Sequence, residues 1–283
     1  MSGMLSVGPL VLPLTLVAFI ASVLMGQGVA AWLAMRRGSD TQLPMGRVLL
    51  TGILASRAAF VAQQFDAYSA DPVSILDIRD GGWNATAGFA AAWAHAVWLG
   101  GHRSSWKAPM LTGIAVATLV WAGAHWVAAA TGSGEPRASL PETTFRTLEG
   151  EPRSLQAFQG KPVVLNLWAS WCPPCRLEMP GFAQAQADHP EITFVFLNQG
   201  ERTAVVQQFL AQQGLALENV LLDVDTQAAT VFGHRALPAT LFFDAFGRHV
   251  DTRLGELSRA TLAQRLALIS HAPAPHTSKE MLP

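Results

Sequence analysis

The chain has 283 residues and a formal net charge of −1, and half of its residues are hydrophobic while only 14% are charged. Soluble proteins have about 25% charged residues, so the composition argues against an ordinary soluble protein. The balanced charge, with no basic patch containing aromatic residues, gives no support for nucleic-acid binding.

The charges are divided unevenly along the chain. Residues 1–130 contain seven Lys and Arg and five Asp, whereas the remainder contains twelve basic and fifteen acidic residues. Two domains in different solvents are the simplest interpretation. We predict a membrane domain over residues 1–130, a polar linker over 131–139, a soluble domain over 140–271 and a disordered tail over 272–283.

Four apolar segments of the first domain are candidates to cross a bilayer as helices, which requires about 20 residues. They are residues 9–35, 48–65, 83–99 and 109–130. The third is short and rich in alanine, and Arg57 interrupts the second. The first lacks a preceding basic region and its apolar run is long, so we do not expect a cleaved signal peptide. These segments predict an α-helical transmembrane bundle of about four spans.

The loops between these segments differ in charge, and basic loops remain in the cytoplasm. The first and third loops are basic, with Arg36, Arg37, Arg47, Arg103 and Lys107. The second loop contains four Asp and one Arg. Four spans then place the N-terminus and the soluble domain in the periplasm, with the chain as a multi-pass protein of a bacterial inner membrane. Three spans would leave the soluble domain in the cytoplasm.

The soluble domain alternates between strand and helix patterns. We predict a small hairpin over residues 143–155 and a terminal helix over 257–269. Between them the apolar runs indicate strands at 162–168, 192–197, 220–224, 239–244 and 249–253 and helices at 174–188 and 203–213. This alternation is typical of an α/β domain.

Cys172 and Cys175, the two cysteines of the chain, are separated by two prolines. They follow a predicted buried strand and begin a predicted helix, which is the setting of a thioredoxin-like redox motif. At a helix N-terminus, the helix dipole and free backbone N–H groups stabilise a thiolate. A thiolate is the species that attacks disulfides.

Residues 160–180, GKPVVLNLWASWCPPCRLEMP, resemble the TlpA-like branch of the thioredoxin superfamily, and the resemblance covers about 140–270. Members of this branch are extracytoplasmic thiol–disulfide oxidoreductases with a thioredoxin-like fold. The resemblance implies that Cys172 is the nucleophile and Cys175 the resolving thiol. It also implies that Pro238 is a cis-proline facing the disulfide. We expect no cofactor and no metal.

Four further residues qualify this mechanism. Asn166 resembles the position at which thioredoxin has a buried Asp, and an amide cannot shuttle a proton. Glu178 lies about one helical turn after Cys175 and resembles an active-site Glu of some TlpA-like proteins. Our hypothesis is that Glu178 moves a proton to or from the Cys175 thiol; the alternative is a solvated helix residue. Trp171 and Leu237, with the apolar surface next to Pro238, are predicted to dock the substrate chain.

Residues 57–61 (RAAFV) and 71–83 (DPVSILDIRDGGW) resemble part of the prolipoprotein diacylglyceryl transferase family, over about residues 45–95. The family's histidine is replaced by Thr86, and its later Gly-Arg-x-Gly-Asn signature is absent. We therefore interpret this half as a truncated, degenerate transferase-like module that has lost acyl transfer. Our hypothesis is that it binds a lipid or a partner near Arg57; the alternative is that Arg57 extends to the membrane surface.

The predicted spans contain no cysteine, so they cannot relay thiol electrons across the bilayer. A reductase would need a separate membrane thiol-electron donor, besides its disulfide-containing extracytoplasmic substrates and the lipid bilayer. His95 and His125 lie in predicted spans and could hold haem or a metal, but no ligand pattern surrounds them. Interior hydrogen bonding or an interface position is the preferred interpretation.

These patterns predict a membrane-anchored periplasmic thiol–disulfide oxidoreductase that reduces protein disulfides through its CPPC motif. One alternative is a Cu(I) metallochaperone, because soft thiolates suit copper, with Met179 and His234 near the cysteines. Another is a lipid-modifying transferase that carries a redox domain.

Overall fold

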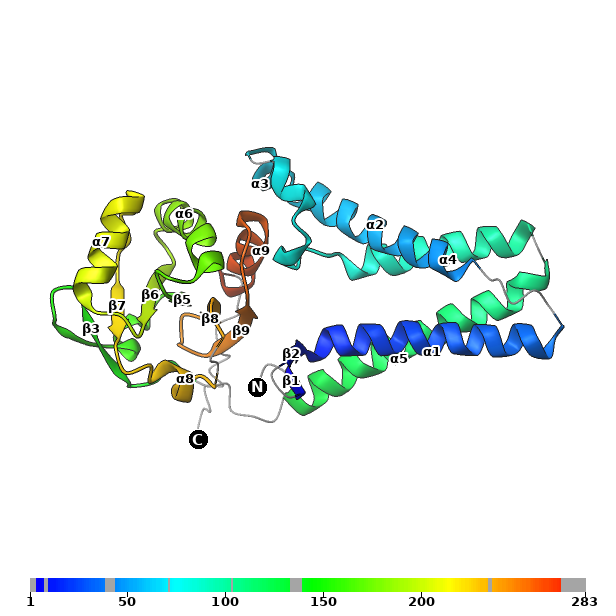
Figure 1. Ribbon diagram of the computed structural model, residues 1–283, viewed down its shortest axis with the longest axis horizontal. Helices are drawn as coiled ribbons and strands as arrows, with labels where there is room; N and C mark the ends of the chain where they lie inside the picture. Colours follow the sequence, from blue (N-terminus) through cyan, green and yellow to red (C-terminus); the bar gives the residue numbers. More distant parts are fainter. Residues whose placement is uncertain are drawn as a thin grey trace, which may run out of the picture. The chain divides into compact units, whose positions relative to one another are not determined.

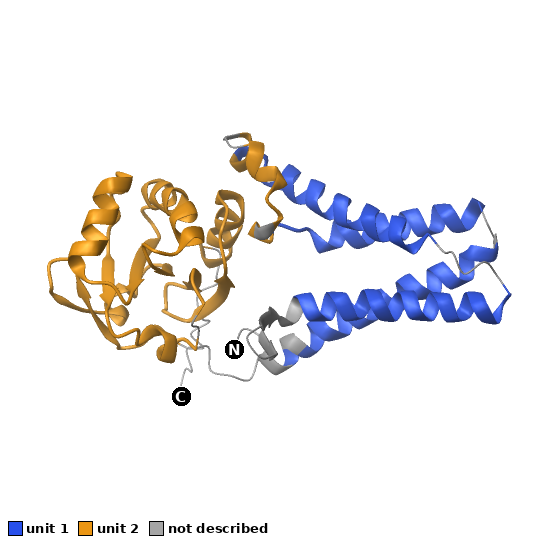
Figure 2. Cartoon of the chain, in the orientation of Figure 1, with its two compact units in different colours: residues 1–66, 82–136 blue, residues 67–81, 137–283 orange. Residues whose placement is uncertain are grey.

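The computed structural model describes residues 4–7, 10–38, 44–70, 72–102, 104–132, 139–233 and 236–270. The chain forms two compact units (Figure 2): unit 1 is residues 1–66 with 82–136, and unit 2 is residues 67–81 with 137–283. The segment 67–81 therefore groups with the soluble domain, although the sequence places it between two predicted spans. The predicted tail and most of the predicted linker lie outside the described residues.

The described part of unit 1 contains four long helices (Figure 1): α1 (Leu14–Arg36), α2 (Met45–Gln63), α4 (Ala85–His102) and α5 (Ser104–Gly132). Two short strands, β1 (Met4–Val7) and β2 (Leu10–Pro13), pair before α1. Helix α1 packs along α5 and α2 along α4, and α4 also contacts α5. A Cβ atom on Gly26 would lie 2.6 Å from the Gly113 carbonyl oxygen, so the absence of a side chain lets α1 and α5 approach closely.

Three of these helices, rather than the predicted four, are long and apolar enough to cross a membrane. They are Leu16–Arg36, Met45–Gln63 and Ser105–Val127, judged by length and composition among the described residues. The third predicted span forms α4, a helix rich in Ala and Gly with two His residues, and it is not among these three candidates.

Unit 2 is built around a seven-stranded sheet in the order β4-β3-β7-β6-β5-β8-β9. The three strands β5, β6 and β7 are parallel, while β8, β9, β3 and β4 pair antiparallel to their neighbours. The strands are β3 (Thr144–Thr147), β4 (Pro152–Ser154), β5 (Val163–Trp168), β6 (Thr193–Gln199), β7 (Val220–Asp223), β8 (Ala239–Phe243) and β9 (His249–Leu254). The helices are α6 (Pro173–Asp188), α7 (Thr203–Gln213), α8 (Ala228–Val231) and α9 (Arg259–Ser270), with a 3₁₀ turn η3 (Leu155–Phe158).

Strand β5 lies in the middle of the sheet and is buried along its whole length. Val164 and Trp168 pack into a cluster with residues of α6, α7 and α9. Val163, Leu165 and Leu167 point to the other face, where they pack with residues of η3 and α8. Because both faces are covered, the strand reads as a continuous apolar run rather than an alternating one.

The segment 67–81 contacts the sheet unit through polar groups. It contains most of α3 (Phe65–Ala70) and two 3₁₀ turns, η1 (Pro72–Leu76) and η2 (Ile78–Asp80). The Tyr68 hydroxyl donates to Asp80 Oδ2 at 2.7 Å, and the Ser258 hydroxyl donates to the same oxygen at 3.1 Å. Asp80 is thus buried with two donors, as a carboxylate removed from water requires.

The strands and helices predicted for the soluble domain are found within a few residues of their expected bounds, which confirms the α/β class. Helix α7 ends as expected at Gly214, whose φ of 62° is left-handed and therefore suits glycine. Helix α8 was not predicted, because a single turn of four residues gives too little periodicity to recognise.

Candidate active site

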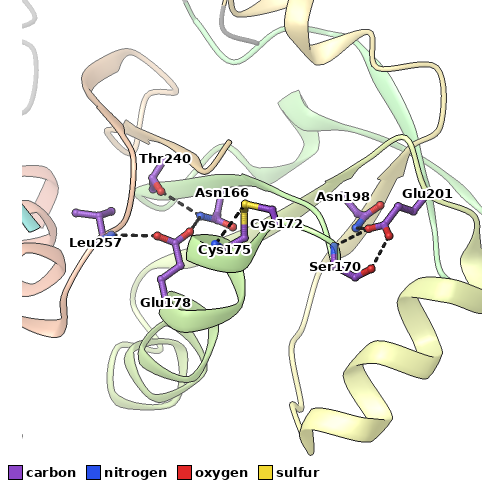
Figure 3. Close-up of a disulfide and its surroundings, with 9 residues drawn as sticks. All are labelled: Asn166, Ser170, Cys172, Cys175, Glu178, Asn198, Glu201, Thr240 and Leu257. Atoms are coloured by element: carbon purple, nitrogen blue, oxygen red, sulfur yellow. Dashed lines mark hydrogen bonds between the residues drawn. A yellow bond between two sulfur atoms is a disulfide. The ribbon is translucent and has the colours of Figure 1, made fainter. Parts of the chain in front are cut away.

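Cys172 and Cys175 lie where β5 passes into α6, and they form a disulfide (Figure 3). Cys172 is the N-cap residue of α6, and its Sγ accepts a hydrogen bond from the Cys175 N–H at 3.3 Å. Cys172 is 3% exposed, whereas Cys175 is fully buried. Of the two sulfurs, that of Cys172 is therefore the more accessible to an incoming disulfide.

The two prolines between the cysteines occupy the first two positions of α6. The first turn of a helix offers free N–H groups, but proline has none. The N–H of Cys175 is therefore the first of these helix donors that can reach the Cys172 sulfur. This spacer supplies fewer donors to a Cys172 thiolate than two ordinary residues would.

A buried polar cluster containing Glu178 lies beside the cysteines (Figure 3). Glu178 is on α6, one turn after Cys175, and is 3% exposed. Its Oε1 accepts from the Asn166 side-chain amide at 2.8 Å and its Oε2 accepts from the Leu257 N–H at 3.0 Å. Asn166 also donates to the Thr240 hydroxyl at 3.1 Å. Glu178 is thus a buried residue and not the solvated helix residue of the alternative interpretation.

Burial governs the acidity of Glu178. Removal from water disfavours the carboxylate and raises the pKa of Glu178 to about 8, although the hydrogen bonds from Asn166 and Leu257 act in the opposite direction. A carboxyl group with a pKa near neutrality can both hold and release a proton at physiological pH, which is the property required of an acid–base group.

The residues predicted to dock the substrate lie around the same edge of the sheet. The Leu237–Pro238 peptide bond is cis. It directly precedes β8, whose first residue Ala239 is opposite Leu167 near the end of β5. Leu237 packs against the cluster that contains both cysteines, and Trp171, beside Cys172, is 67% exposed.

A second buried carboxylate beside the cysteines was missed by the sequence analysis. Glu201 follows β6 and is 9% exposed. It accepts hydrogen bonds from the N–H and hydroxyl of Ser170 and from the side-chain amide of Asn198 (Figure 3). The one signal in the sequence is that Asn198 lies near the end of β6 and Glu201 follows it, and β6 is the parallel neighbour of β5.

In unit 1, Arg57 is buried on α2. Its Nη1 donates to the Gly82 carbonyl at 2.9 Å, and its guanidinium carbon lies 5.8 Å from the ring centroid of Trp83. Arg57 therefore makes contacts within unit 1, where the segment that precedes α4 provides its acceptor.

The two histidines of the predicted spans also have neighbours in unit 1. His95 Nδ1 lies 2.7 Å from the hydroxyl of Thr51, which forms a hydrogen bond between α4 and α2. The ring of His125 packs on Trp121 with centroids 4.4 Å apart. The contact of His95 is a hydrogen bond between two helices, as the preferred interpretation expects.

The copper alternative relied on two residues besides the cysteines. Met179 is fully buried in the same cluster as Cys172 and Cys175, and His234 lies outside the described residues. Among the residues that are described, no group of three or more His, Cys, Asp and Glu side chains is arranged to hold a metal ion.

Comparison with known proteins identifies the family of unit 2. The AhpC/TSA family profile matches residues 136–249. The thiol–disulfide oxidoreductase ResA of Halalkalibacterium halodurans is 30% identical over 124 residues, which are 43% of this chain and 70% of that protein. The soluble secreted antigen MPT53 of Mycobacterium tuberculosis is 32% identical over 129 residues, 45% of this chain and 74% of that protein.

A solved structure of MTB DsbF, in mixed oxidised and reduced forms, is 31% identical and covers 45% of this chain and 95% of its own, with a TM-score of 0.42. The name of the relative ResA, a thiol–disulfide oxidoreductase, agrees with the Cys172–Cys175 disulfide of this chain. Through its C-terminal half, the chain belongs to the thioredoxin-like thiol–disulfide oxidoreductases related to ResA.

Proposed function

We propose that the protein is a membrane-anchored thiol–disulfide oxidoreductase that reduces the disulfides of extracytoplasmic proteins. The observation that carries the proposal is the Cys172–Cys175 disulfide at the start of α6, with Cys172 as the N-cap and the more exposed sulfur. The proposed site residues are Cys172, Cys175, Pro238 and Glu178, and Trp171 and Leu237 are proposed to dock the substrate.

The reaction is a two-electron dithiol exchange. The Cys172 thiolate attacks one sulfur of the substrate disulfide, which forms a mixed disulfide and releases the other substrate sulfur as a thiolate. The Cys175 thiolate then attacks the Cys172 sulfur, which releases the second substrate thiolate. The substrate disulfide is reduced to two thiols, and the pair Cys172–Cys175 is oxidised to a disulfide.

The donors around Cys172 bear on the direction of exchange. A strong oxidant of this fold is one whose reduced, thiolate form is stabilised. Here the two prolines remove two backbone donors from the first turn of α6, and the Cys175 N–H remains. A less stabilised thiolate favours the disulfide form of the enzyme, and this supports the reductase direction.

Glu178 is proposed to exchange a proton with Cys175. The second step requires Cys175 to lose its proton, and the carboxyl group lies one helical turn away on the buried side of α6. Because burial raises the pKa of Glu178 to about 8, the group can accept that proton near neutral pH and return it when the enzyme is reduced again.

Unit 1 is proposed to be the membrane anchor. If α4 crosses the bilayer with the three more apolar helices, the soluble domain and the N-terminus lie on the same, periplasmic side. The basic first and third loops support this orientation, and the name of the relative MPT53 describes a secreted protein. The resemblance of residues 45–95 to diacylglyceryl transferases supports a lipid or partner site near Arg57. A separate membrane thiol donor would reduce the Cys172–Cys175 disulfide.

Turnover and trapping of a mixed disulfide test this function. The reduced full chain in detergent micelles is expected to reduce insulin disulfides in the presence of dithiothreitol, and Cys172→Ser should abolish the activity. Cys175→Ser should accumulate a mixed disulfide through Cys172, because the resolving thiol is absent. An inactive wild-type protein would refute the proposed oxidoreductase activity.

The direction is tested in living cells by alkylation with a mass tag. A mostly reduced Cys172–Cys175 pair supports a reductase with a donor, whereas a mostly oxidised pair contradicts it.

A further inference from the structure

A buried carboxylate holds the backbone that leads to Cys172. Glu201 Oε2 accepts from the Ser170 N–H at 2.7 Å and from the Asn198 amide at 2.7 Å, and its Oε1 accepts from the Ser170 hydroxyl. Three donors therefore converge on one acid that is 9% exposed. Hydrogen bonds to an ionised acceptor are among the strongest in proteins, so this contact fixes Ser170 at both its main chain and its side chain.

The sheet brings these residues together. Strands β5 and β6 are parallel neighbours, with Trp168 opposite Asn198, so their carboxyl ends lie at the same edge. Gly200 follows β6 with a φ of 74°, and its N–H donates to the Asp223 carbonyl at 2.9 Å. This left-handed residue turns the chain, and Glu201 then lies beside the segment that leaves β5 (Figure 3).

Ser170 belongs to the turn that delivers the nucleophile. The Cys172 N–H donates to the Ala169 carbonyl at 3.2 Å, which closes a four-residue turn from Ala169 to Cys172. Ser170 is the first central residue of this turn and the exposed Trp171 is the second. Cys172, the last residue of the turn, is also the N-cap of α6. The position of the Cys172 sulfur therefore depends on the turn to which Glu201 is hydrogen-bonded.

We propose that Glu201 is a positioning residue for the dithiol exchange: it holds the turn 169–172 so that the Cys172 sulfur and Trp171 face the incoming disulfide. The inference rests on the proposed function and adds a second carboxylate to the site, with a role different from that of Glu178. Glu178 lies beside Cys175 on α6, whereas Glu201 acts through Ser170 on the other side of the disulfide.

Charge and position have opposite effects on the reaction, so they can be separated. Glu201→Gln removes a negative charge near Cys172, and this alone favours the thiolate and lowers the pKa of the Cys172 thiol. A larger thiolate fraction at neutral pH would keep the rate equal or raise it. Loss of the hydrogen bonds that hold the turn lowers the rate, because small displacements of reacting atoms slow a reaction strongly.

Three variants of the full chain in detergent micelles test the proposal. Glu201→Gln removes the charge and one acceptor, Ser170→Ala removes the hydroxyl donor alone, and Ser170→Thr retains a hydroxyl. Asp244→Asn is the matched control: Asp244 is also a buried carboxylate after a strand, and it accepts from the N–H groups of Phe246 and Arg248 and from the Arg248 side chain. It lies beyond Phe243, which is opposite Val163 at the other end of β5.

The measurements are kcat and KM for insulin reduction, and the Cys172 thiol pKa from the pH dependence of alkylation. We expect Glu201→Gln to lower kcat about tenfold with KM changed less than about twofold, although the Cys172 pKa does not rise. Ser170→Ala should lower kcat by a smaller factor and leave the Cys172 pKa unchanged. Ser170→Thr, which retains a hydroxyl, should have a kcat close to that of the wild type.

Three results would overturn the positioning role. They are an unchanged kcat in Glu201→Gln, a rate that follows the thiol pKa alone, or an equal loss of kcat in Asp244→Asn. A wild-type chain that reduces no disulfide would instead refute the proposed function itself.

Discussion

Replacing Glu178 by Gln should change how the stability of unit 2 depends on pH. In the folded state burial raises the pKa of Glu178 from 4.5 to about 8, whereas the unfolded chain exposes an ordinary carboxyl group. Between these values the folded state binds one more proton than the unfolded state, so stability falls as pH rises. The stabilising contribution is complete below pH 4.5 and is lost as pH rises through 8.

The magnitude follows from the size of the shift. Each pH unit is worth about 1.4 kcal/mol, so the wild type should lose roughly 3 to 4 kcal/mol more than Glu178→Gln between pH 5 and pH 8. The amide of Gln is neutral throughout. The Gln side chain has one donor where Glu178 has an acceptor, so one hydrogen bond with Asn166 or Leu257 is weakened. This loss of stability does not vary with pH and therefore cancels when the two pH values are compared.

Urea unfolding of the oxidised full chain in detergent measures this difference, with pulse proteolysis of unit 2 as the readout. The oxidised form is chosen because cysteines in a disulfide do not titrate. The exposed Glu218 provides the control, and Glu218→Gln should change stability by less than about 0.5 kcal/mol at either pH. An equal effect of Glu178→Gln at pH 5 and pH 8 would refute the reasoning.

Two further predictions concern the docking surface and the helix packing. Trp171→Ala should raise KM for insulin several-fold while leaving the urea midpoint of unit 2 unchanged, because this side chain is 67% exposed; a large loss of stability would show that it has a structural role instead. Gly26→Ala should lower the melting temperature of unit 1 in detergent, because the new Cβ would lie 2.6 Å from the Gly113 oxygen. In Gly28→Ala the new Cβ meets nothing within 4 Å, so this control should be neutral or slightly stabilising.

The fold of unit 2 is legible in the sequence because its strands are buried on both faces. The segment that forms β5 is apolar at five of its six positions. A nearly continuous apolar segment of this length is typical of a strand that is buried on both faces. The helix start after it is marked by Cys172 and two prolines, a pattern that suits an N-cap and the first helical turn. The two cysteines, their spacing and this strand-to-helix setting were sufficient to predict a cysteine pair at the start of α6.

The sequence was less informative where a contact joins distant parts of the chain. Asp80 accepts a hydrogen bond from Ser258, 178 positions away, and nothing local in the segment 67–81 indicates that it belongs with the sheet unit. The number of spans was predicted only in part, because three of the four expected helices are candidate spans. The alanine-rich helix α4 packs against α2 and α5, but it is not among the helices that have the hydropathy of a candidate span.

Glu178 and Glu201 show why the residue type alone does not assign a role at this site. Both are buried glutamates beside one disulfide, but they differ in what surrounds them. Glu201 accepts hydrogen bonds from three donors, one of them the Ser170 N–H in the turn before Cys172. These bonds hold the backbone of the turn in place. Glu178 has two donors, and burial outweighs them to raise its pKa. If both roles are correct, Glu201→Gln should lower the rate at every pH, whereas Glu178→Gln should change the shape of the pH–rate profile.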